Sequence, residues 1–190
     1  MKKNIAIFAS GGGSNAEKIM SFFSQHQTIQ VKVVLTNNSE AGVLAKAKKF
    51  HVESVIFDSK KTDGNHLLKL MQDFSVDFIV LAGYLKKVPA EITKAYKNKL
   101  VNVHPALLPK FGGPGMYGIN VHRAVVASKE KISGMTIHYV NDHYDEGAII
   151  EQHSCEISAD DTPEIVAEKV LQLEHKFFAP CIEKLIENEI

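Results

Sequence analysis

The sequence contains no tryptophan, only two cysteines and no net charge. Cys155 and Cys181 form neither a CxxC motif nor a disulfide framework, which favours a reduced, cytoplasmic protein. The 22 basic residues are balanced by 22 acidic ones, so the chain lacks the broad positive charge that attracts nucleic acid. We therefore expect no nucleic-acid partner.

Long apolar runs are also missing. Only six largely apolar residues separate Lys3 from Ser10, too few for a signal peptide or a membrane span, so we expect no membrane partner. The 190 residues are enough for one domain with a sizeable core, and no repeat or linker divides them. The sequence therefore predicts a single domain over residues 1–190.

What the chain does contain is an alternation of short apolar runs and helical patterns in its first half. The predicted strands cover residues 5–9, 29–36, 54–57, 78–83 and 100–103, and the predicted helices cover 16–23, 41–50, 65–74 and 89–96. Such an alternation is typical of right-handed βαβ units. We therefore predict an α/β fold, with a Rossmann-like, mostly parallel sheet and helices on both faces.

The pattern changes in the second half of the chain. A predicted helix and two predicted antiparallel edge strands cover residues 121–128, 134–140 and 148–152. Thr162 and Pro163 suit the N-cap and the first position of a C-terminal helix. Because proline cannot donate the helical hydrogen bond, we expect Pro180 to kink or split this helix near Ala179.

A glycine-rich turn connects the first predicted strand to the first predicted helix. It reads Ser10-Gly11-Gly12-Gly13-Ser14-Asn15. A turn of this kind aims backbone N–H groups and a helix dipole at an anion, and Ser14 or Asn15 can cap the helix and touch the ligand. The turn matches neither the GxGxxG fingerprint nor a Walker loop. A tight connection without a ligand is the alternative interpretation.

The most informative stretch surrounds residues 101–109. Asn102 and His104 stand two residues apart at the end of a strand, on the same side of its pleat, and Pro105 stops the strand. Ligands bind at the carboxyl ends of parallel strands, where this pair can supply an acid or base beside a donor that polarises a carbonyl. Alternatively, Asn102 is a turn residue and His104 a buried histidine with its hydrogen bonds satisfied.

The connection between the two predicted edge strands offers a carboxylate for His104. Asp145 is preferred over Asp142, because it precedes a tight turn at Glu146-Gly147 that would present it. A nearby carboxylate favours the protonated imidazole. Several histidines and aspartates also raise a metal site as an alternative, but no metal-ligand spacing such as HExxH occurs, and we predict no metal.

Several of these segments together resemble a known family. The segments are Ser10 to Asn15, Leu81-Ala82-Gly83-Tyr84, the Asn-x-His-Pro-x-Leu-Leu-Pro motif at 102–109, His138-Tyr139-Val140, Asp145-Glu146-Gly147 and Glu174-His175. In this order they resemble the phosphoribosylglycinamide formyltransferases, folate-dependent enzymes of purine (IMP) biosynthesis. The resemblance implies the formyltransferase fold. It also implies a nucleotide-binding half over residues 1–104 and a folate-binding and catalytic half over residues 105–190.

The resemblance implies transfer of a formyl group from 10-formyltetrahydrofolate, as co-substrate, to the glycyl amine of glycinamide ribonucleotide. Asn102 would hold the formyl oxygen, His104 would act as general acid, and Asp145 would raise the pKa of His104. The residues implied at the ribonucleotide phosphate and ribose are Gly13, Ser14, Asn15 and Glu174. Those implied at the folate are Lys60, Leu85, Lys86, Lys87, Val88, Asn102, Asn141, Asp142, His143 and Tyr144.

The sequence departs from the family pattern in places. Lys60, implied at the glutamate tail of the folate, and Lys86 stand where similar enzymes commonly carry arginine, which makes a carboxylate contact looser. Lys87 replaces an aliphatic residue, so only its backbone contact is carried over. The loop over residues 111–120 is longer than in many relatives. The resemblance leaves open whether the protein is a monomer or a homodimer.

Three other functions could use parts of the same pattern. A formyltetrahydrofolate hydrolase would use the same Asn102, His104 and Asp145 to activate water. Hydrolases of this kind look like this core with an additional N-terminal domain, whereas Met1 here lies close to the first predicted strand. A methionyl-tRNA formyltransferase would need an RNA-binding domain and a basic surface. A nucleotide-binding module would use only the glycine-rich turn and leaves the three polar residues unexplained.

Overall fold

The computed structural model describes residues 2–188, which form a seven-stranded sheet in the order β3-β2-β1-β4-β5-β6-β7. The strands are β1 (Lys3–Phe8), β2 (Ile29–Thr36), β3 (Glu53–Ile56), β4 (Phe78–Leu81), β5 (Leu100–His104), β6 (Ile132–Tyr139) and β7 (Ile149–Glu156). The first five pair in parallel, and β6 and β7 are antiparallel. The predicted mixed sheet with antiparallel edge strands is therefore confirmed.

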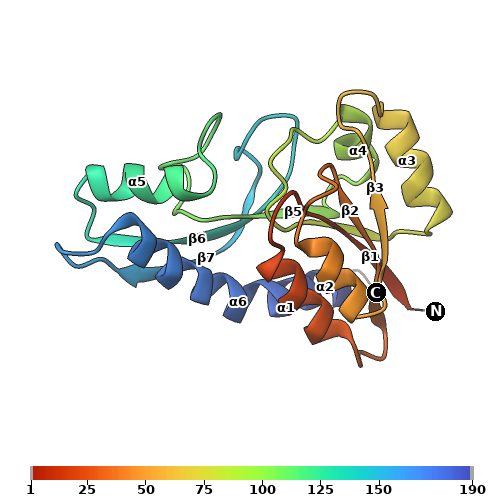
Figure 1. Cartoon of the computed structure of the whole chain (residues 1–190), viewed down its shortest axis with the longest axis horizontal. Coiled ribbons are helices and arrows are strands. Elements are labelled where there is room, and N and C mark those ends of the chain that lie inside the picture. Colours follow the sequence, from red (N-terminus) through yellow and green to blue (C-terminus); the bar gives the residue numbers. More distant parts are fainter. Residues whose placement is uncertain (1, 189–190) are drawn as a thin grey trace.

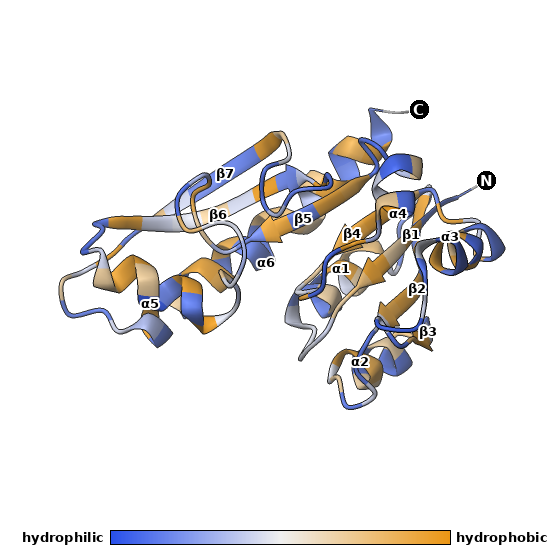
Figure 2. Ribbon diagram, turned by 90° about the horizontal axis from the view of Figure 1, so that it is seen from above, coloured by the Kyte–Doolittle hydropathy of each residue, from blue (hydrophilic) through white to orange (hydrophobic). Residues whose placement is uncertain are grey.

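Helices cover both faces of this sheet (Figure 1). The helices are α1 (Ser14–Phe23), α2 (Val43–Lys49), α3 (Gly64–Asp73), α4 (Ala90–Ala95), α5 (Ile119–Ala127) and α6 (Pro163–Glu187). Side chains alternate along β1, so that Ile5 and Ile7 pack with α1, α2, α5 and α6, whereas Ala6 and Phe8 pack with α3 and α4. Figure 2 shows the resulting concentration of apolar residues in the central strands.

The order of the strands reverses at β1, and ligands commonly bind at the carboxyl ends of the strands at such a point. β1 has β2 on one side and β4 on the other. The chain leaving β1 and the chain leaving β4 therefore run in opposite directions across the sheet, and a crevice forms between the ends of these two neighbouring strands. The two connections are joined by a hydrogen bond of 3.0 Å from the Ser10 backbone N–H to the Gly83 carbonyl. The carboxyl end of β5, with His104, follows beside them.

The C-terminal helix begins as predicted but is not split. The Thr162 side chain accepts a hydrogen bond from the Ile165 N–H, and Pro163 occupies the first turn. The helix then continues without a break through Pro180 to Glu187, so the predicted split near Ala179 is wrong. Phe178 and Ile182, on either side of the proline, are buried in one core cluster, and this packing stabilises the helix on both sides of Pro180.

α6 is also the longest helix, with 25 residues. Neither α6 nor any other helix found between residues 2 and 188 combines the length and the apolar character needed to cross a membrane.

Candidate active site

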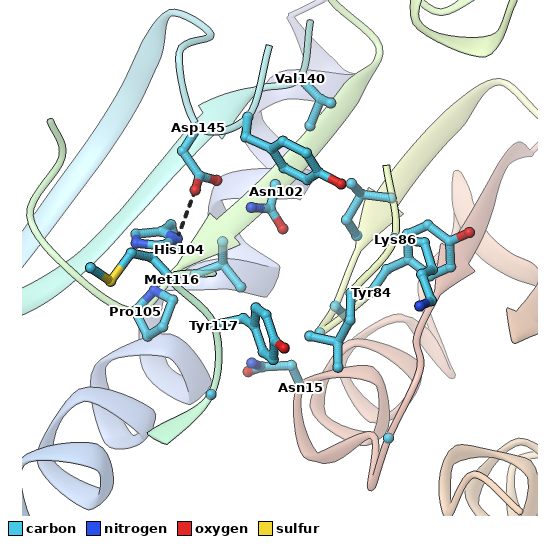
Figure 3. Close-up of a pocket in the computed structure, with 18 of the residues that line it drawn as sticks. Asn15, Tyr84, Lys86, Asn102, His104, Pro105, Met116, Tyr117, Val140 and Asp145 are labelled. Carbon is cyan, nitrogen blue, oxygen red and sulfur yellow. Dashed lines mark ion pairs between the residues drawn. The ribbon is translucent and has the colours of Figure 1, made fainter. Parts of the chain in front are cut away.

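A cavity of about 680 Å³ opens at the carboxyl ends of β1, β4 and β5. Its walls come from the glycine-rich turn, residues 81–88, the end of β5, the loop over residues 113–119 and the connection between β6 and β7 (Figure 3). This volume lies within the range of sites that hold small organic ligands. The cavity therefore joins the predicted anion site to Asn102, His104 and Asp145.

The glycine-rich turn reaches the cavity through the N-terminus of α1. The N-cap is Gly13, in the left-handed region at φ 71°, and no side chain caps the helix, so the expected cap by Ser14 or Asn15 is wrong. A Cβ atom on Gly13 would lie 2.7 Å from Cβ of Val43, so glycine is required here. Without a side-chain cap, the N–H groups of the first turn are available to an anion.

Asn15 and Glu174, from α1 and α6, meet in the wall beside this turn. Nδ2 of Asn15 donates a 2.6 Å hydrogen bond to Oε2 of Glu174, which is 7% exposed. Burial raises the pKa of Glu174 to about 7, although the bond from Asn15 opposes the shift. Oδ1 of Asn15 is buried and has no hydrogen-bond partner among the described residues. His175, which follows Glu174 in the family segment, does not line the cavity.

The amide of Asn102 is oriented by His138 on the neighbouring strand β6. His138 Nδ1 lies 2.9 Å from the Tyr139 carbonyl oxygen, which can only accept, so Nδ1 carries the proton. Burial lowers the pKa of His138 and favours the neutral ring, whose Nε2 accepts a 3.1 Å bond from Asn102 Nδ2. One N–H and the Oδ1 atom of Asn102 remain for a ligand.

Both ring nitrogens of His104 face acceptors. Nε2 lies 2.8 Å from the carbonyl oxygen of Phe111, and Nδ1 lies 3.5 Å from Oδ2 of Asp145. Only the imidazolium form can satisfy two acceptors at once. The 3.5 Å separation is longer than an ordinary hydrogen bond, so an oxygen atom entering the cavity can share the Nδ1–H. The side chain of His104 is 4% exposed.

Asp145 is presented by a tight turn after Val140. Its backbone has φ 57°, in the left-handed region that aspartate tolerates better than most residues. Oδ2 accepts a 2.9 Å bond from the Gly113 N–H, and Oδ1 lies 3.7 Å from Nε2 of His138. A Cβ atom on Gly147 would lie 1.6 Å from the Tyr139 carbonyl oxygen, so this turn also requires glycine.

Most of the predicted folate residues line the cavity, and two of them do not. Those that line the cavity are Leu85, Lys86, Lys87, Val88, Asn102, Asn141, His143 and Tyr144. Asp142 does not line it, because its carboxylate accepts a hydrogen bond from Thr93 on α4. Lys60 also lies outside the cavity walls, in the connection between β3 and α3.

Potential metal ligands do not gather in the cavity. Among residues 2–188, the group of three such side chains close enough to share an ion is His26, Glu183 and Glu187, none of which lines the cavity. The chemistry of the cavity walls is that of a hydrogen-bond donor, an imidazole and a carboxylate. Such a set can polarise a carbonyl group and donate a proton to it.

The cavity-wall residues that the sequence did not assign to the site include His138, His122 and Tyr117. His138 is noted in the sequence only as part of a family motif. Its contact with Asn102 depends on which ring nitrogen carries the proton, and the hydrogen bond to the Tyr139 carbonyl decides this. His122, on α5, is buried, its Nδ1 has no partner among the described residues, and burial lowers its pKa. Tyr117 lies in the long loop before α5. The sequence signal for Tyr117 is its place in a glycine-rich loop that directly follows the motif at 102–109, a segment that can contact a substrate.

Comparison with known proteins identifies the family. Residues 3–182 match the model of the formyl transferase family. The chain belongs to this family. It is therefore an enzyme of the formyltransferase class, and the resemblance predicted from the sequence is confirmed.

Individual members of the family align with nearly the whole chain. The phosphoribosylglycinamide formyltransferase of Arabidopsis thaliana chloroplasts is 40% identical over 196 residues, which cover 100% of this chain and 67% of the plant protein. The phosphoribosylglycinamide formyltransferase of Bacillus subtilis is 33% identical, with 97% of this chain and 95% of the relative covered. The crystal structure of the enzyme of that name from Anaplasma phagocytophilum superposes with a TM-score of 0.90 at 28% identity, covering 99% and 89% of the two chains.

Proposed function

We propose that this protein transfers the formyl group of 10-formyltetrahydrofolate to the glycyl amine of glycinamide ribonucleotide in purine biosynthesis. The observation that carries the proposal is the grouping of Asn102, His104 and Asp145 in a cavity that continues to the glycine-rich turn. The names of the relatives support the same substrate. One cavity can thus hold the formyl group at its centre and an anionic nucleotide at one end.

The chemical step needs an acid and an oxyanion donor. The amine nitrogen of the ribonucleotide attacks the formyl carbon, and the carbonyl oxygen takes up negative charge. The free N–H of Asn102 and the Nδ1–H of His104 donate to this oxygen, which lowers the barrier by stabilising the tetrahedral intermediate. The bond from the formyl carbon to N10 then breaks as N10 gains a proton from His104, directly or through water, and the proton lost by the attacking amine returns to His104, which is charged again for the next turnover.

Asp145 would act on this step through His104. Its carboxylate stabilises the positive imidazole at a distance of 3.5 Å, where little water screens the pair. The bond from Gly113 to Asp145 fixes the carboxylate in this position. Asp145 therefore keeps the acid charged while the formyl oxygen becomes negative.

The two ends of the cavity suit the two substrates. At the uncapped N-terminus of α1, the N–H groups after Gly13 would bind the phosphate, together with Ser14 and Asn15. Glu174, beside Asn15, would bond the ribose. At the other end, the backbone of residues 85–88 and 141–144 would hold the pteridine, and Lys60, outside the cavity, would face the glutamate tail.

The proposal is tested by following an isotopically labelled formyl group. Wild-type protein is incubated with labelled 10-formyltetrahydrofolate, with and without glycinamide ribonucleotide. We expect label in the formylated ribonucleotide, and release of tetrahydrofolate only when the acceptor is present. Label appearing as formate without the acceptor would instead support the hydrolase reaction.

A further inference from the structure

Tyr117 is a cavity residue that the proposed catalytic step leaves unused. It lines the same cavity as Asn15 and Glu174, and it is 50% exposed. Figure 3 shows its ring extending over the part of the cavity where Asn15 lies. Within residues 2–188, the phenol hydroxyl has no hydrogen-bond partner. A large side chain is thus held at the ribonucleotide end of the cavity without a partner of its own.

The backbone around Tyr117 is ordered by turns. The Met116 N–H donates to Gly113 at 3.1 Å, the Tyr117 N–H donates to Gly115 at 3.2 Å, and the Tyr117 carbonyl accepts from Asn120 at 3.3 Å. Gly113 and Gly115 both have positive φ, which permits these successive turns. The direction in which Tyr117 projects is therefore set by the loop.

The base of this loop is tied to the catalytic residues. Phe111 bonds His104 through its carbonyl group, and Gly113 bonds Asp145 through its N–H. The position of Tyr117 is consequently fixed relative to the catalytic residues. A ligand that spans the cavity from His104 to the glycine-rich turn would therefore meet Tyr117, which lines the same cavity.

The wall opposite Tyr117 is polar and incompletely satisfied. Asn15 Oδ1 is buried without a partner, and Glu174 beside it carries the raised pKa described above. A buried acceptor of this kind gains free energy from a ligand that brings a donor, such as a sugar hydroxyl. A tyrosine on the other side offers a flat apolar ring for the sugar and a hydroxyl that can donate to a phosphate or sugar oxygen.

We propose that Tyr117 is a specificity-determining residue that covers the sugar–phosphate portion of the ribonucleotide from the side opposite Asn15 and Glu174. The ring packs on the ribose, and the phenol hydroxyl bonds a sugar or phosphate oxygen. This inference rests on the proposed function, and it concerns binding of one substrate, not the chemical step.

The test compares three variants by steady-state kinetics with each substrate varied in turn. Tyr117→Ala removes both ring and hydroxyl, and should raise KM for the ribonucleotide about tenfold or more with less than a threefold change in KM for the folate. Tyr117→Phe removes one hydrogen bond and should raise the same KM about threefold to tenfold. Because Tyr117 is half exposed, the melting temperature should not change.

Tyr144→Ala is the matched control. Tyr144 is similarly exposed, at 43%, and lines the same cavity from the β6–β7 connection, on the predicted folate side. Its loss should raise KM for the folate and leave KM for the ribonucleotide within threefold. If both tyrosine variants raise KM for the ribonucleotide equally, Tyr117 has no specific role and the inference is wrong.

Ribose 5-phosphate, used as a competitive inhibitor, locates the contact on the ligand. Its inhibition constant should rise in Tyr117→Ala by the same factor as KM for the ribonucleotide. A raised KM with an unchanged inhibition constant would place the contact on the glycyl group and overturn the inference. If wild type transfers formyl to the ribonucleotide and Tyr117→Ala keeps a wild-type KM, the inference fails while the proposed function stands. Absence of transfer by wild type would remove both.

Discussion

Nδ1 of His104 lies 3.5 Å from Oδ2 of Asp145, in a pair whose side chains are only 4% and 12% exposed. At such a distance, opposite charges with little water between them attract by several kcal/mol, on the order of 4 kcal/mol at an effective dielectric constant of 20. The carbonyl group of Phe111 holds the other ring nitrogen, so the ring cannot turn away. In the proposed reaction, this pair presents the imidazole of His104 beside Asn102.

Replacing Asp145 by asparagine should remove this charge and little else. Asparagine tolerates the left-handed backbone of residue 145, and its amide oxygen can still accept the bond from Gly113. We expect kcat to fall on the order of 10²-fold while the melting temperature stays close to that of wild type. A kcat within threefold of wild type would show that the carboxylate does not act on His104.

His138 should act through Asn102. Because its Nε2 accepts a bond from the Asn102 amide, His138→Ala should leave the amide free to rotate and lower kcat about tenfold, with little change in either KM. In a double-mutant cycle, adding His138→Ala to Asn102→Ala should cost little further activity. Fully additive losses would mean that the histidine acts independently of the amide. Unfolding of each variant is measured in parallel, because His138 is buried.

Glu174 should make stability depend on pH. Burial raises its pKa from 4.5 to about 7 in the folded protein, so the folded state holds a proton between these values that the unfolded state has released. The contribution of Glu174 to stability is therefore greatest below pH 4.5, falls by about 3 kcal/mol as the pH rises to 7, and then levels off. Glu174→Gln, which stays neutral, should lack this contribution.

The measurement for Glu174 is urea unfolding of both proteins between pH 4.5 and 8. Wild type minus Glu174→Gln gives a difference in unfolding free energy from which the other titrating groups largely cancel. This difference should decrease with rising pH. A difference that stays constant, or increases, would contradict the assignment of a protonated Glu174 in the folded state.

Gly13 and Gly11 form a matched pair for the glycine-rich turn. Alanine at position 13 would require a positive φ and would place its Cβ atom 2.7 Å from Val43, so we expect a loss of about 2 kcal/mol or more in unfolding free energy. A Cβ atom on Gly11 meets nothing within 4 Å, so Gly11→Ala should cost less than about 1 kcal/mol. Equal losses in chemical denaturation would show that the turn does not require glycine at position 13.

Much of the fold could be predicted from local patterns. Buried apolar runs such as Phe78–Leu81 have few alternatives to a central strand, and helix boundaries were off by only a few residues. The split predicted at Pro180 was wrong, because the rule for proline in helices considers only local hydrogen bonds. Packing of Phe178 and Ile182 in the core keeps α6 continuous. The caps proposed at Ser14 and Asn15 failed because Gly13 already occupies the N-cap.

The sequence indicated which residues form the candidate site better than it indicated the contacts between them. Asn102 and His104 stand in one motif, and the structure brings Asp145 to them as expected. The bond from His104 to Phe111 and the orientation of Asn102 by His138 depend on tertiary contacts between segments, which no spacing in the sequence reveals. The same holds for Asp142, whose side chain turns to Thr93 and away from the cavity.

In the proposed mechanism, formyl transfer to the ribonucleotide depends on the imidazole of His104. The most direct measurement is a single-turnover assay with labelled 10-formyltetrahydrofolate and glycinamide ribonucleotide, with His104→Ala beside wild type. We predict label in the ribonucleotide for wild type and a rate lower by about 10²- to 10⁴-fold for the variant, with both substrates still bound. A rate within tenfold of wild type in His104→Ala would contradict the account.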